Sequence, residues 1–142
     1  MIVVADASVL VSELLRRRGR DLLSHPELQV VVAEDQWNET LHELDKRLGA
    51  ITQHRQLTSA QAQELRAAVH ELVDSHVIEV IPRSFYEHAE STARRRIPRD
   101  ARDWPTIALA IALNAGILTG DNDFLGCGCP TWTVETLARE LE

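Results

Sequence analysis

Acidic residues recur in this sequence where predicted strands give way to helices or turns. Asp6 follows a short β-branched run, Asp103 precedes an apolar helical stretch, and Asp121 follows another apolar run. In open α/β sheets, ligands bind beyond the carboxyl ends of the strands, so we expect these side chains to lie close together. Crowded carboxylates repel each other, and hard divalent cations such as Mg²⁺ or Mn²⁺ prefer oxygen ligands. The pattern therefore predicts a carboxylate metal site.

A further acid is expected from the helix that follows the second predicted strand. Glu39 and Glu43 are one turn apart on the same face of that helix, so spacing alone does not separate them. Glu39 is the preferred candidate because it is closer to the end of the strand. Glu39 also forms one Glu-x-x-His with His42, but di-iron bundles need two such motifs, so His42 is interpreted as a helix-surface residue. Asp123 adds a fifth candidate ligand.

Each acid also has an ordinary structural explanation, because Asp is common at helix N-caps and in turns. Asp103 is a candidate cap for the helix that follows it, and Asp121-Asn-Asp123 has the composition of an Asx turn. Asp6 fits the turn into a helix capped by Ser8. The recurrence of acids at three separate junctions favours a shared site over three unrelated caps.

Basic residues are outnumbered in this chain, with 15 Lys and Arg against 22 Asp and Glu and a net charge of -7. This balance argues against a protein that coats nucleic acid non-specifically, since phosphate binding depends on Lys and Arg. Arginines gather in two segments, at residues 16–20 and 94–102. The second segment comes just before Asp103, which makes four of its members candidates for gripping RNA phosphates: Arg95, Arg96, Arg99 and Arg102. The alternative is that each segment is a solvated helix end.

The length of 142 residues suits one domain with a substantial core, so residues 1–142 are expected to form a single unit. The longest apolar run, 107–118, is shorter than the ~20 residues of a membrane helix, so no membrane span is expected. Asp6 interrupts the first apolar stretch and no basic residue precedes it, unlike a secretory signal. We therefore expect a cytoplasmic protein. Cys127 and Cys129 are expected to be a reduced pair in a loop, without zinc.

Strand and helix patterns alternate along the chain. Apolar, β-branched runs predict strands at 1–5, 28–33, 77–81, 117–119 and 131–134. Helical spacing predicts a helix from Val9 up to Gly19, and others at 34–48, 58–75, 103–116 and 135–141. Thr58 is the expected cap of the third of these, Ser84 and Glu87 have the capping-box spacing that starts another helix, and Gly116 lies past the end of the 103–116 helix. The alternation predicts a three-layer α/β/α sandwich around a mostly parallel sheet.

Four segments together resemble PIN domains over essentially the whole chain: residues 4–8, 37–47, 99–110 and 119–124. The resemblance implies an endoribonuclease fold in which Asp6, Glu39, Asp103 and Asp121 form an acidic quartet. It also implies that Asp123 is a supporting acid and that Ser8 and Thr119 orient carboxylates. The VapC-type toxins of this family imply a small antitoxin partner and often a homodimer. The helical hairpin region 51–72 is longer than in the smallest toxins.

Taken together, these features predict hydrolysis of RNA phosphodiesters with one or two Mg²⁺ or Mn²⁺ ions, which lower the pKa of a bound water. Two other functions stay open. A haloacid-dehalogenase-like phosphotransferase also has an Asp after its first strand, but it needs a second Asp where Ser8 stands and a Lys that only Lys46 could provide. A non-catalytic PIN-like interaction module would keep the fold without the chemistry.

Overall fold

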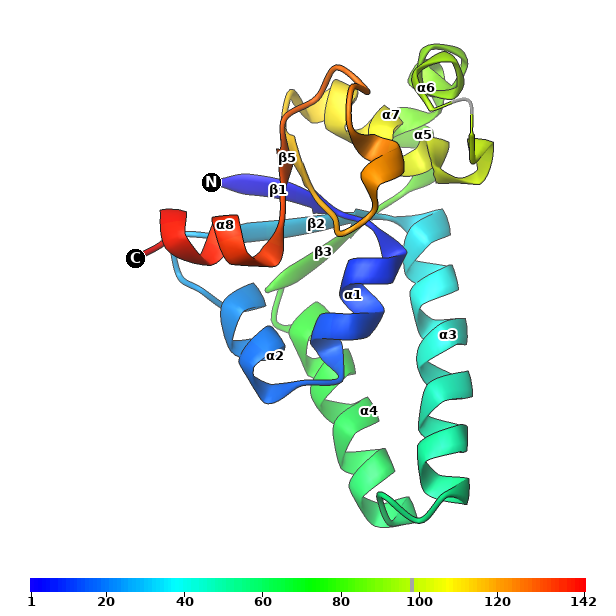
Figure 1. Ribbon diagram of the computed structural model, residues 1–142, viewed down its shortest axis with the longest axis vertical. Helices are drawn as coiled ribbons and strands as arrows, with labels where there is room; N and C mark the ends of the chain where they lie inside the picture. The colour runs from blue at the N-terminus through cyan, green and yellow to red at the C-terminus, as the bar shows by residue number, and fades with distance from the viewer. Residues whose placement is uncertain (98) are drawn as a thin grey trace.

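A five-stranded sheet with helices on both faces forms the centre of the protein, whose computed structural model describes residues 1–97 and 99–142 (Figure 1). The strands are β1 (Ile2–Ala5), β2 (Gln29–Ala33), β3 (Ile78–Ile81), β4 (Gly116–Leu118) and β5 (Thr131–Trp132), in the order β3-β2-β1-β4-β5. All of these pairings are parallel. The predicted three-layer α/β/α sandwich is confirmed.

The helices are α1 (Ala7–Leu14), α2 (Arg17–Leu23), α3 (Glu34–Gln53), α4 (Ser59–Asp74), α5 (Arg83–Tyr86), α6 (Glu90–Arg96), α7 (Trp104–Leu113) and α8 (Val134–Glu140). Short 3-10 turns lie at η1 (Glu87–Ala89), η2 (Ala101–Asp103) and η3 (Asn122–Phe124). Within the described residues, none of these helices combines the length and the apolar composition that crossing a membrane requires.

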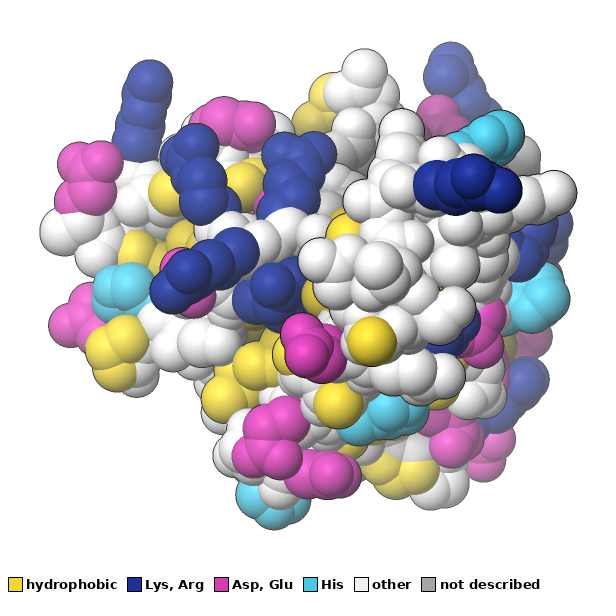
Figure 2. Space-filling view, turned by 90° about the horizontal axis from the view of Figure 1, so that it is seen from below, with side chains coloured by type: hydrophobic (Ala, Val, Ile, Leu, Met, Phe, Trp, Pro, Cys, Tyr) yellow, Lys and Arg dark blue, Asp and Glu magenta, His cyan; other side chains and the backbone are white. Residues whose placement is uncertain are grey.

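Helices α3 and α4 form a hairpin that projects away from the sheet at the bottom of Figure 1. Thr58 caps α4 as predicted, and Gln61 completes a capping box by accepting from the Thr58 N–H at 2.9 Å. Helix α3 runs five residues past its predicted end at Leu48, because Gly49 is exposed and a single glycine weakens a helix only modestly. Acidic and basic side chains are interspersed over the surface seen from this end of the molecule (Figure 2).

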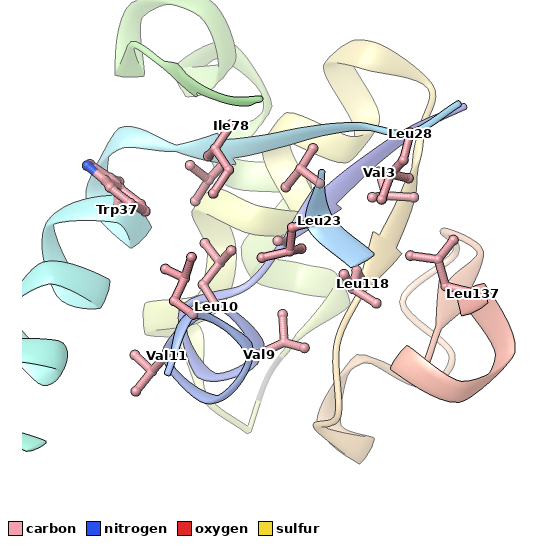
Figure 3. Packing of buried hydrophobic residues seen from close by; sticks show 14 of the residues in the cluster. Val3, Val9, Leu10, Val11, Leu23, Leu28, Trp37, Ile78, Leu118 and Leu137 are labelled. Carbon is pink, nitrogen blue, oxygen red and sulfur yellow. The ribbon is translucent and has the colours of Figure 1, made fainter. Parts of the chain in front are cut away.

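Two hydrophobic cores lie on opposite faces of the sheet, because successive side chains of a strand point to opposite faces. Val3 and Ala5 of β1 join a core covered by α1, α2, α3, α4 and α8, part of which Figure 3 shows around Leu10, Leu23 and Leu118. Val4 joins the other core, which α5, α6 and α7 cover. Burial of both faces explains the nearly continuous apolar sequences of β1 and β2.

Helix α7 is apolar on almost every side because it packs against both the sheet and helices α5 and α6. It ends at Leu113, where Asn114 adopts a left-handed conformation with φ of 52°. Gly116 lies past the end of the helix as predicted, but the helix already ends at Leu113 and Gly116 begins β4. A side chain there would begin 3.0 Å from the Trp132 Nε1 atom, so the close packing between β4 and β5 favours glycine.

Three other helix predictions differ from the structure. The capping box at Ser84 is wrong, because α5 begins one residue earlier and the Arg83 N–H donates to Glu34 Oε1 at 2.8 Å. Helix α1 ends at Leu14 instead of continuing towards Gly19, and α2 is a separate helix. Helix α6 was not predicted as a separate helix. Both α2 and α6 are short and rich in arginine, so neither carries an apolar stripe that reveals a helix.

Candidate active site at the carboxyl edge of the sheet

Strands β1 and β4 end side by side, and the chain leaves them in opposite directions across the sheet. From β1 the chain continues to β2 on one side, whereas β4 and β5 lie on the other side. Such a change of direction leaves a crevice beyond the strand ends, which is the usual ligand site of open α/β sheets. Asp6 follows β1 here, and Thr119 follows β4.

A chain of hydrogen bonds joins the polar residues after β1 and β4. The Thr119 hydroxyl donates a short hydrogen bond to Asp6 Oδ2 and accepts one from the Asp121 N–H at 2.9 Å. The Asp123 N–H then donates to Asp121 Oδ1 at 2.8 Å, which is the Asx-type turn expected from the sequence. These contacts fix the positions of Asp6 and Asp121 relative to each other.

Asp6 also caps the helix that follows it. Its Oδ1 atom accepts from the Val9 N–H at 2.8 Å, and the side chain is buried, with 3% of its surface exposed. The prediction that Ser8 caps this helix is therefore wrong, since Ser8 lies inside α1. Ser8 is exposed and, together with Asp121, lines a cavity of about 600 Å³ beside the strand ends.

Asp103 occupies the cap position before α7, but its side chain makes no capping hydrogen bond. Burial, as the largest cause, and the charges of Asp100, Asp6, Asp121 and Glu39 together raise its pKa to about 7. The pKa of Asp6 is raised as well, mainly by burial, although the hydrogen bonds from Thr119 and Val9 lower it. The acids expected from three separate junctions therefore lie close enough to repel one another.

Glu39 and Glu43 of α3, which spacing alone left unresolved, have different surroundings. The charge of Glu39 raises the pKa of both Asp6 and Asp103. Glu43 instead forms an ion pair with Lys46, with Oε1 and Nζ 3.4 Å apart. The structure thus brings Glu39 towards the other acids, while Glu43 is paired one turn further along the helix. His42 is exposed, as expected of a helix-surface residue.

Gln36 connects the two chain segments that carry Asp6 and Asp103. It is 2% exposed, its Oε1 accepts from the Ala7 N–H at 3.2 Å, and its Nε2 donates to the Arg102 carbonyl at 3.4 Å. Sequence reasoning did not find this residue, because a glutamine in the first turn of a helix is common and only the tertiary fold brings its partners together. Through these two hydrogen bonds, Gln36 links the residue after Asp6 to the residue before Asp103.

Two arginines of the second basic segment lie beside the acids. Arg99 Nη1 is 3.6 Å from Asp123 Oδ1, and Arg102 Nε is 3.3 Å from Asp100 Oδ1. The pKa of Arg102 is raised first by Asp100 and also by Glu39 and Asp103. Both guanidinium groups are largely exposed, at 83% and 90%, which leaves them accessible to a ligand in the crevice.

The other arginines of that segment are bound to their own surroundings. Arg95 donates to the hydroxyls of Ser91 and Thr92 in α6, at 3.0 and 3.3 Å. Arg96 donates to the Cys127 carbonyl at 3.5 Å, in the loop where Cys127 and Cys129 are free thiols. The predicted arginine patch is therefore divided, because Arg95 and Arg96 belong to α6 whereas Arg99 and Arg102 lie beyond its end.

The donor set at this edge suits a hard cation, since it consists of carboxylate and hydroxyl oxygens. In residues 1–97 and 99–142, no three Asp, Glu, His or Cys side chains stand close enough to hold a metal ion as they are placed. Glu39 is exposed and Asp121 is half-buried, so both side chains have room to change rotamer towards an ion. The residues fit Mg²⁺ or Mn²⁺ in chemistry and charge.

Comparison with known proteins adds two findings. The matching family model is described as a PIN domain and covers residues 4–142. One similar solved structure is the crystal structure of FitAcB from Neisseria gonorrhoeae, with a TM-score of 0.54 and 20% sequence identity over 93% of this chain and 96% of that chain. At this identity the likeness concerns the fold alone. Among curated proteins, none matches the sequence.

Proposed function

The chain belongs to the PIN-domain family, and on that premise we propose that it is an endoribonuclease that hydrolyses RNA phosphodiesters with Mg²⁺ or Mn²⁺. PIN domains are generally nucleases. The observation that carries the proposal is the gathering of acids at one edge of the sheet, where Thr119 links Asp6 to Asp121 and where burial and neighbouring charges raise the pKa of Asp103 to about 7. Acids placed so close together destabilise the fold unless a cation or proton compensates their charge.

In this proposal, Asp6, Glu39, Asp103 and Asp121 hold the cations, and Asp123 supports them. When bound, the cations supply an activated water and positive charge for the scissile phosphate. Thr119 keeps the carboxylate of Asp6 in one orientation through its hydrogen bond. Such partners of ligating carboxylates maintain metal affinity, which assigns Thr119 a positioning role. Ser8, which lines the cavity beside Asp121, is placed to contact the substrate.

Arg99 and Arg102 are proposed to contact RNA phosphates next to the acids. Their guanidinium groups are exposed, and arginine binds phosphate oxygens through paired N–H donors. Their present partners, Asp123 and Asp100, would be exchanged for phosphate when RNA enters. Arg95 and Arg96, which also belong to the proposed contact segment, would reach only phosphates further along the strand.

We also propose that the protein is the toxin of a toxin-antitoxin pair, with a small antitoxin protein as its partner and a homodimer as its assembly. The resemblance of the four sequence segments to VapC-type toxins supports this role. Membership of the PIN-domain family supports it as well. Co-expression with a small candidate antitoxin and copurification of the two chains would test the partnership.

The phosphotransferase alternative is disfavoured by the surroundings of the residues that it needs. Ser8 stands where a second Asp is required, and Lys46 is exposed and paired with Glu43. An interaction module without catalysis remains the competing function, since a shared fold does not fix activity.

The experiment that tests the proposed function compares two substrates. An end-labelled single-stranded RNA and p-nitrophenyl phosphate are incubated with the protein in Mn²⁺, in Mg²⁺ and in EDTA. We expect internal cleavage of the RNA that requires the metal, and no release of p-nitrophenol. Hydrolysis of the monoester alone would indicate a phosphotransferase, and no reaction with either substrate would indicate an interaction module.

A further inference from the structure

The first arginine segment, at residues 16–20, lies on a groove that begins at the candidate active site. A cavity of about 600 Å³ extends from Ser8 and Asp121 to Arg16, between α1 and the start of α8. A second cavity of about 390 Å³ is lined by Arg16, Arg18 and Ala138, between α2 and α8. The two cavities share Glu13, Arg16, Val134 and Glu135, so they form one continuous groove.

Arg16 and Arg18 are available for an external ligand. Both side chains are exposed, and no carboxylate of the described residues lies within ion-pair distance of either. By contrast, three arginines of the second segment are paired with acids: Arg94 with Glu90, Arg99 with Asp123 and Arg102 with Asp100.

The lining of the groove is mixed in charge, because Glu13 and Glu135 face it together with the arginines. Arginines bind backbone phosphates. Carboxylates accept hydrogen bonds from ribose 2′-hydroxyls, which RNA has and DNA lacks. The hydroxyls of Ser12 and Thr133 add further hydrogen-bonding groups. This combination suits a single strand of RNA better than it suits DNA or an acidic peptide.

We propose that this groove binds the RNA strand that flanks the scissile phosphate, with Arg16 and Arg18 contacting phosphates of that strand. The inference rests on the proposed nuclease function, because the groove begins at Asp121. In this proposal, Arg16 and Arg18 bind the part of the RNA strand that lies beyond the acids. Arg99 and Arg102 then contact the phosphates nearest the metal ions.

A charge-matched pair of variants tests this inference. Arg16→Ala with Arg18→Ala removes two positive charges from the groove, and Lys46→Ala with Arg47→Ala removes two from the exposed face of α3. Binding of a fluorescent single-stranded RNA is measured by anisotropy in Ca²⁺ over a series of salt concentrations. We expect the groove variant to bind about tenfold more weakly. Its slope of log K against log salt should flatten by about 1.4, or about 0.7 for each lost phosphate contact. The control should keep the wild-type slope.

A second readout separates the groove from the chemistry. Hydrolysis of bis(p-nitrophenyl) phosphate in Mn²⁺ reports on the acids, because this diester has no flanking nucleotides to occupy the groove. We expect the groove variant to lose more of its RNA cleavage than of its hydrolysis of this diester. If the wild type hydrolyses neither the diester nor RNA, the proposed function fails, while the RNA-binding comparison still tests the groove.

Two outcomes would overturn the groove assignment. One is RNA binding by the Arg16→Ala, Arg18→Ala variant with the affinity and salt slope of the wild type. The other is equally tight binding of a DNA strand of the same sequence by the wild type, because the carboxylates of the groove would then play no part in selecting ribose. If this variant binds RNA like the wild type but no longer self-associates, as judged by its mass in light scattering, the groove is a contact between protein chains instead.

Discussion

The two sides of the candidate site are held in different ways. After β1 and β4, the oxygens of Asp6 and Asp121 accept hydrogen bonds from Thr119, Val9 and the Asp123 N–H. On the side of α3 and α7, the carboxylates of Glu39 and Asp103 accept no hydrogen bond from the described residues. Asp6 and Asp121 therefore also stabilise the fold, as a helix cap and as part of a turn. Glu39 and Asp103 have no such structural role, so substituting them tests the function of the site most cleanly.

The largest effect is expected from Asp103→Asn, on the side without hydrogen bonds. This substitution should lower Mn²⁺-dependent RNA cleavage by more than about a hundredfold, since losing even a partner of a metal ligand costs 10- to 100-fold. The protein should stay folded, because no capping bond is lost. Cleavage assays beside thermal melts check both statements. Asp35→Asn and Asp45→Asn, whose carboxylates pair with Arg83 and Arg66, serve as controls that keep activity.

A comparison of Glu39→Gln with Glu43→Gln sharpens the assignment on α3. Of these two acids, Glu39 is the one whose charge raises the pKa of Asp6 and Asp103, so its substitution should reduce cleavage by about tenfold to a hundredfold and that of Glu43 should not. Steady-state cleavage rates at saturating Mn²⁺ measure the difference. Equal losses in the two variants would mean that both acids act on the site and that the preference for Glu39 is mistaken.

The hydrogen bonds between the segments after β1 and β4 can be removed at Thr119, whose hydroxyl joins Asp6 to Asp121. Thr119→Val keeps the shape but removes the hydroxyl, so Mn²⁺ affinity should fall by about 10-fold, the lower end of the effect of such supporting groups. Unfolding free energy should fall by about 1–3 kcal/mol, because Asp6 loses a buried partner. Thr119→Ser retains the hydroxyl and should restore the affinity measured by calorimetry. A Thr119→Ser variant as weak as Thr119→Val would show that the methyl group matters instead.

A further prediction concerns the dependence of stability on pH in the metal-free protein. The pKa of Asp103 is about 7 in the folded state against 3.8 in its ordinary environment. Between these values the folded state holds a proton that the unfolded state releases, so the free energy of unfolding falls as pH rises from about 4 to about 7. Urea unfolding in EDTA at several pH values measures this trend. In Asp103→Asn the decrease should be smaller, and an unchanged decrease would exclude Asp103 as its source.

Much of the fold was predictable because its signals are local. The strands and the long helices each carry a periodic apolar pattern, and Asp6, Asp103 and Asp121 follow directly from their positions at element ends. Helices α2 and α6 were missed for the opposite reason, since their sequences are short and polar.

The site was less predictable, because several of its contacts join residues far apart in the sequence. Gln36 bonds to Ala7 and to Arg102, and nothing in its own neighbourhood marks it. The second arginine segment was taken as one patch, but successive side chains on a helix differ in direction by about 100°. Only Arg99 and Arg102, which lie beyond α6, approach the acids.

The most direct test of the account is whether Mn²⁺ stabilises the protein through these acids. Thermal unfolding is measured for the wild type and for Asp121→Asn, each in EDTA and in Mn²⁺. At about a hundred times its dissociation constant, an ion that binds only the folded state adds about 2.7 kcal/mol, so the wild-type melting temperature should rise. Asp121→Asn should keep the Asx-type turn and lose most of that rise. A wild-type melting temperature that is the same in Mn²⁺ and in EDTA would contradict the metal site and, with it, the proposed nuclease.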